Sequence, residues 1–109
     1  MNEVNFIELD LIENYKIKFK CFDAPDGYQA TFHIYAKDDD SAHYQIDFVI
    51  TGTEYNTVID GNIKPNKDLI NEKYGGLENC FKNVGVEYIK EKVKQNNLKN
   101  ESINILKLI

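Results

Sequence analysis

Hydrophobic and polar residues alternate with a period of two through the first half of the chain. This alternation places successive side chains on opposite faces of an extended backbone, so it predicts half-buried β-strands and not helices. We predict five strands, at residues 6–12, 15–22, 28–37, 43–51 and 55–60. The connections are short and rich in Asp, Asn, Gly and Pro, which favours hairpins between consecutive strands. The predicted sheet is therefore an antiparallel meander.

The spacing of apolar residues becomes helical in the second half of the chain. Asn66 can cap a short helix that Gly75 and Gly76 end. A longer helix at residues 77–95 carries one apolar row that should cover the sheet: Leu77, Cys80, Phe81, Val84 and Tyr88. A second row lies nearly opposite the first: Val86, Ile89 and Val93. One straight helix on one sheet should not bury both rows, so either Gly85 breaks the helix or the second row meets another surface.

These elements predict a single domain over residues 1–109 of the α+β class. We expect an antiparallel meander sheet of five or six strands, with one main C-terminal helix packed on its inner face. The short apolar segment at residues 103–109 would be the sixth strand or a packed tail. A chain of 109 residues is long enough for one core and too short for two.

Composition narrows the classes of function. The chain has 18 acidic residues against 13 basic ones, and all the basic residues are Lys. Without the planar guanidinium group of Arg, nucleic acid is not an expected ligand. Neither a basic, apolar leader nor a long apolar run is found in the sequence, so we expect a cytoplasmic protein without a membrane partner.

Motifs for metal ions or cofactors are also missing. Cys21 and Cys80 are far apart and have no second cysteine nearby, which is typical of buried, reduced thiols. The three aspartates at positions 38–40 lack the Asp or Asn, the Gly and the Glu that a calcium-binding loop needs further along. We therefore expect no metal and no cofactor.

Three lysines at positions 16, 18 and 20 would share the outer face of the sheet. If the apolar positions of the first hairpin pair, Glu8 lies opposite Lys18 and Asp10 lies opposite Lys16. This row of lysines is then largely neutralised, and we interpret it as a solvated face of the sheet.

The same outer face offers one set of residues for acid–base chemistry. Matching the core positions of the third and fourth strands places His33 opposite Asp47 or Gln45, with Tyr35 close by. A metal-independent enzyme could use His33, Asp47 and Tyr35. An open sheet face leaves these groups in water, without the buried surroundings that tune a catalytic group, so we do not expect catalysis there. His43 is predicted to be a surface residue and not a partner of His33.

Acidic residues gather at one end of the predicted meander. Its first, third and fifth connections lie at that end and carry Glu13, Asp38, Asp39, Asp40 and Asp60. A concentrated negative patch attracts and orients a basic partner. These five residues are our predicted partner-binding site.

In its whole-chain character, the sequence resembles the small acidic immunity proteins that bacteria encode beside toxic nuclease domains, including those of contact-dependent growth inhibition systems. The resemblance consists of a short chain with a net charge of -5, many Asn and Lys residues, and a strand meander followed by a helix. It implies a non-catalytic protein that binds one cognate basic toxin in the cytoplasm and covers its active site with acidic side chains. Two alternatives remain: an interaction or adaptor domain that dimerises through Val86, Ile89 and Val93, and the small enzyme with His33, Asp47 and Tyr35.

Overall fold

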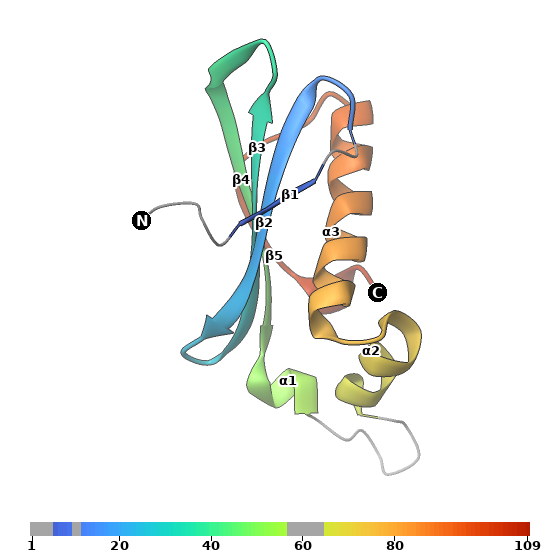
Figure 1. Ribbon diagram of the computed structural model, residues 1–109. Coiled ribbons are helices and arrows are strands. Elements are labelled where there is room, and N and C mark those ends of the chain that lie inside the picture. Colours follow the sequence, from blue (N-terminus) through green and yellow to red (C-terminus); the bar gives the residue numbers. More distant parts are fainter. Residues whose placement is uncertain (1–5, 10–11, 57–64) are drawn as a thin grey trace.

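A five-stranded sheet with helices on one face forms the fold (Figure 1). The computed structural model describes residues 6–9, 12–56 and 65–109, with the backbone alone for residues 39–42. The strands are β1 (Ile7–Leu9), β2 (Tyr15–Ala24), β3 (Gly27–Ala36), β4 (Asp39–Thr51) and β5 (Glu101–Asn104). They lie in the sheet in chain order, and the predicted α+β class is confirmed.

The first four strands form the predicted antiparallel meander. In the first hairpin, Ile7 pairs with Phe19 and Glu8 with Lys18, as the match of apolar positions predicts. Phe19 is fully buried on the inner face of the sheet. The expected pair of Asp10 and Lys16 lies outside the described residues.

The predicted strand at residues 55–60 is wrong where the structure describes it. Residues Gly52–Asn56 form a short helix, α1, that turns away from the end of β4, and residues 57–60 lie outside the described part of the chain. Thr51 and Glu54 explain why the strand ends: the Glu54 amide donates to the Thr51 hydroxyl at 3.0 Å, and the Thr51 amide donates to the Glu54 carboxylate at 3.0 Å. This reciprocal capping box starts a helix where the sequence pattern suggested a hairpin turn.

The last strand departs from the meander. β5 is parallel to β4, with Ile103 beside Phe48, because the chain returns to the sheet through the helices and not through a hairpin. The segment predicted at residues 103–109 is thus a strand only as far as Asn104, and a turn of 3-10 helix, η1 (Ile105–Lys107), follows it. Ile105 is fully buried, so the end of the chain closes one side of the core.

Two further helices cover the inner face and one end of the sheet: α2 (Asn66–Tyr74) and α3 (Leu77–Lys94). Figure 1 shows α3 running along one face of the sheet, whereas no described helix lies on the other face. Gly75, in the left-handed conformation at φ 81°, ends α2 as predicted.

α3 continues through Gly85 as one helix, and both of its apolar rows face the core. Gly85 lies between the two rows on the helix surface, and a Cβ atom there would be 2.5 Å from the Phe32 ring. The missing side chain lets the helix lie close enough to the sheet for both rows to pack beside it. Val86 and Ile89 are buried. The expectation that one straight helix on one sheet cannot bury both rows is therefore wrong, and the proposed dimer patch loses two of its three residues.

Aromatic residues fill the core between α3 and the sheet. Phe32 contacts Phe19 and Phe48, with ring centroids 4.9 Å and 5.5 Å apart, and Phe81 of α3 belongs to the same cluster. Both cysteines are free thiols, and burial raises the pKa of each to about 11.

Candidate functional site

Two of the five predicted acidic residues lie on adjoining turns. Glu13 belongs to the turn between β1 and β2, and Asp38 to the turn between β3 and β4. The backbone amide of Lys37 donates to the carbonyl of Asn14 at 3.0 Å, which holds the two turns side by side. Glu13 and Asp38 are both exposed. We call this surface, made of the turns around Glu13 and Asp38, the acidic turn end.

The other three predicted residues are less fully placed. Asp39 and Asp40 are the first residues of β4, directly after Asp38, and only their backbone is described. Asp60 lies outside the described residues. Its placement at the acidic turn end depended on a fifth strand returning from β4. Instead, β4 leads into α1 at the opposite end of the sheet, where the Gly52 amide donates to the Asp26 carbonyl at 2.8 Å.

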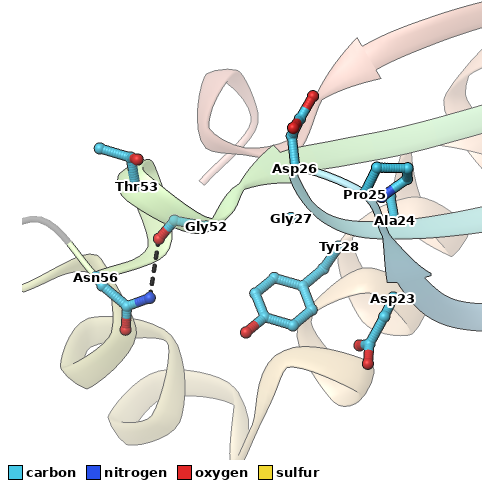
Figure 2. A pocket seen from close by; sticks show the side chains of 9 residues that line it. All are labelled: Asp23, Ala24, Pro25, Asp26, Gly27, Tyr28, Gly52, Thr53 and Asn56. Atoms are coloured by element: carbon cyan, nitrogen blue, oxygen red, sulfur yellow. Dashed lines mark hydrogen bonds between the residues drawn. The ribbon is translucent and has the colours of Figure 1, made fainter.

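That opposite end holds an open cleft of about 660 Å³ beside the turn between β2 and β3 (Figure 2). Asp23 and Tyr28 line it from β2 and β3, Asp26 lines it from the turn between them, and Asn56 lines it from α1. The Asn56 side-chain amide donates to the Gly52 carbonyl at 2.9 Å and so holds one wall. In Figure 2 the carboxylates of Asp23 and Asp26 point to opposite sides of the turn. They do not converge on one point, which a site for a single cation would require.

Glu54, near the same end, has a structural role. Its carboxylate accepts hydrogen bonds from the Thr51 amide at 3.0 Å and from the Asn104 side chain at 2.9 Å and 3.1 Å. These bonds stabilise the charged form and lower the pKa of Glu54 below its ordinary value. Glu54 thereby ties α1 to the end of β5, a contact between distant parts of the chain that the sequence pattern did not reveal.

The proposed acid–base residues share the outer face of the sheet but do not form a chain of hydrogen bonds through Asp47. His33 pairs with Gln45 across β3 and β4, whereas Asp47 pairs with Thr31. The carboxylate of Asp47 accepts from the Thr31 hydroxyl at 2.8 Å and from the Gln45 side-chain amide at 3.2 Å. Asp47 thus accepts from two neutral donors and lies two residues along β4 from the position opposite His33.

The prediction that His43 does not meet His33 is wrong. Their ring centroids are 5.0 Å apart, and the ring of Tyr35 stacks on His43 at 4.6 Å. The reason is the register of β3 and β4: His33 pairs with Gln45 and not with Asp47, so His43 pairs with Tyr35 and lies diagonally beside His33 on the outer face. β4 also begins at Asp39, four residues earlier than predicted, so His43 is inside the strand.

Aromatic rings accompany the lysine row, a feature that the sequence analysis missed. The ammonium group of Lys20 lies 5.8 Å from the ring centroids of both Phe6 and Phe22, and that of Lys18 lies 5.8 Å from the centroid of Tyr35. The signal was present in the sequence, because Phe22 follows Lys20 at the next position of the same strand face. The outer face is therefore partly aromatic and not only a solvated charged surface.

Comparisons with known proteins add no relative: no family model, curated protein or solved structure matches the chain. Among the helices of the described residues, none is long and apolar enough to cross a membrane.

Proposed function

We propose that the protein is a non-catalytic inhibitor that binds a basic partner protein in the cytoplasm, as an immunity protein binds its cognate toxin nuclease. The observation that supports this proposal best is the pairing of the two acidic turns through the hydrogen bond between Lys37 and Asn14. This hydrogen bond brings the exposed residues Glu13 and Asp38 together at the acidic turn end, and Asp39 and Asp40 follow Asp38 in the chain. We do not include Asp60 in this contact, because its assignment depended on the predicted fifth strand.

The carboxylates would act in two ways. Exposed charges attract an oppositely charged protein over about 8 Å at physiological salt, which raises the association rate. In the complex, they would lie against the cations of the partner's active site and exclude its substrate. An exposed ion pair contributes only about 0 to 1 kcal/mol, so a large effect of substitution would mean that these carboxylates lose water on binding.

The test compares the two acidic ends of the sheet. One double variant, Glu13→Gln/Asp38→Asn, removes two charges from the acidic turn end. The matched control, Asp23→Asn/Asp26→Asn, removes two charges from the cleft end. Both keep side-chain size and polarity, and all four residues are outside the core. The binding probe is the C-terminal domain encoded by the adjacent long reading frame, with its toxicity measured in cells.

We expect wild type and the control to bind this domain and to rescue growth, and the Glu13/Asp38 variant to bind more slowly and more weakly. Added salt should slow the association of wild type more than that of the variant. Equal binding by the two variants would remove the acidic turn end as the contact. A failure of wild type to bind the domain or to rescue growth would remove the proposed function itself.

A further inference from the structure

The chain has only two histidines, and the fold brings both to one place. His33 of β3 and His43 of β4 are diagonal neighbours on the outer face, since His33 pairs with Gln45 and His43 with Tyr35. Their ring centroids are 5.0 Å apart and the ring planes are inclined at 49°. Two imidazoles bound to one tetrahedral ion, with metal–nitrogen distances of about 2.0 to 2.1 Å, have centroids about 5 Å apart. The observed spacing fits a shared metal ion.

Neighbouring rings hold both imidazoles in place. Tyr35 stacks almost parallel on His43, with an interplanar angle of 8°, and the Phe6 ring centroid is 5.0 Å from that of His33. Because the centroids of His33 and Tyr35 are 6.4 Å apart, His33 lies beside the stack of Tyr35 and His43 and not in line with it. Side chains held in this way lose little conformational freedom when a ligand binds.

We propose that His33 and His43 together bind one divalent transition-metal ion of the nickel, copper or zinc class. Imidazole nitrogen is a preferred ligand of these ions, whereas calcium and magnesium prefer oxygen. No group of three or more His, Cys, Asp or Glu side chains that could hold a metal occurs in the described part of the chain. Among the described residues, the site has two protein ligands.

One nearby charge opposes this ion. Lys18 pairs with His33 across β2 and β3, and its ammonium group lies over the Tyr35 ring. Like charges repel, so Lys18 weakens the binding of any cation at the two histidines. This predicts an unusual result for a surface substitution: Lys18→Gln should strengthen metal binding.

The test is calorimetric titration of NiCl2 into the full chain without a polyhistidine tag, at about pH 7.5, since metal ligands bind in their deprotonated form. We expect one ion per chain. His33→Gln and His43→Gln should each weaken binding at least about tenfold. Each variant keeps one imidazole, which no longer has a second ligand held close to the same ion. Tyr35→Phe keeps the stacked ring and should bind as wild type does.

A second measurement covers the case in which a histidine variant does not fold. In the NMR spectrum of the unaltered protein, both imidazole signals should broaden together as Ni2+ is added, while the ring signals of Tyr55, from α1, stay sharp. No binding by wild type would overturn the proposal. Binding that keeps its affinity in both His→Gln variants would also overturn it, as would broadening of only one imidazole signal.

Discussion

Replacing Gly85 with alanine adds a methyl group where α3 lies closest to the sheet. The new Cβ atom would be 2.5 Å and 2.6 Å from two carbons of the Phe32 ring and 3.1 Å from the Phe48 ring. Carbon atoms in contact prefer about 3.5 to 4.0 Å, so the helix or the ring must move by about 1 Å. Phe32 is completely buried between Phe19 and Phe48 and has little room to move.

Two opposing effects set the size of the change in stability. Overpacking of a core costs about 1 to 3 kcal/mol, and the crowding around Phe32 places Gly85→Ala near the upper limit. Alanine inside a helix is more favourable than glycine by about 1 kcal/mol. We therefore expect the free energy of unfolding to fall by about 2 kcal/mol.

Urea unfolding followed by circular dichroism measures this change. Asn83→Ala, at an exposed position of the same helix, is the matched control and should be neutral or stabilising by about 0.5 kcal/mol. Combining Phe32→Leu with Gly85→Ala should cost less than the sum of the single changes, because the smaller side chain makes room for the methyl group. If Gly85→Ala is as stable as wild type, the close approach of α3 to Phe32 is wrong.

Four other predictions concern the core, the capping box, the charge of Glu54 and the thiols. Phe48→Ala should lower the free energy of unfolding by about 3 to 5 kcal/mol through a cavity, and a loss below about 1 kcal/mol in urea unfolding would contradict its central position. Thr51→Ala should lower the free energy of unfolding by about 0.5 to 2 kcal/mol through loss of the helix cap. An unchanged urea midpoint would contradict this. The pKa of Glu54 is lowered by folding, so its charge stabilises the protein above the ordinary pKa of about 4.3, and this contribution is lost as the pH falls through the lower folded-state value. The difference in stability between wild type and Glu54→Gln should accordingly shrink with acidification; a constant difference would show that the charge is not involved. Cys21 and Cys80, with pKa values raised to about 11, should react with a thiol reagent at neutral pH much more slowly than in the urea-unfolded chain, whereas equal rates would contradict their burial.

The strands that obey a local pattern could be predicted from the sequence. β1 to β4 alternate cleanly, and a slip of one residue would have exposed Phe19 and Ile17, so the register of the first hairpin followed directly. The two helical segments were also predictable, because apolar residues recur at helical spacing along α3 and Gly75 marks the end of the short α2.

The errors in the predicted fold arose where a local signal or a distant contact overrides the alternation of hydrophobic and polar residues. Thr51 and Glu54 are spaced as a capping box, and this signal in the sequence would have predicted α1 in place of a fifth hairpin strand. The parallel pairing of β5 with β4 has no local signature, since it depends on where the helices return the chain. The place of Gly85 at the closest approach of helix and sheet likewise follows from packing and not from periodicity.

Of the candidate sites, one could be predicted from the sequence and the other could not. Glu13 and Asp38 could be assigned to one end of the sheet, because alternate connections of a meander lie together. The contact of His33 with His43 was not fixed by the sequence, because the alternation left two registers open and only the pairing of His33 with Gln45 places His43 opposite Tyr35.

The central claim is that a basic partner covers the acidic turn end, and mapping the interface by NMR tests it most directly. The protein is labelled with 15N and titrated with an inactivated form of the basic domain encoded by the adjacent reading frame. We predict that the largest changes in amide chemical shift occur at residues 12–14 and 37–39, and that residues 23–28 at the opposite end change little. The largest changes at residues 23–28, or no change at saturating partner, would contradict the claim.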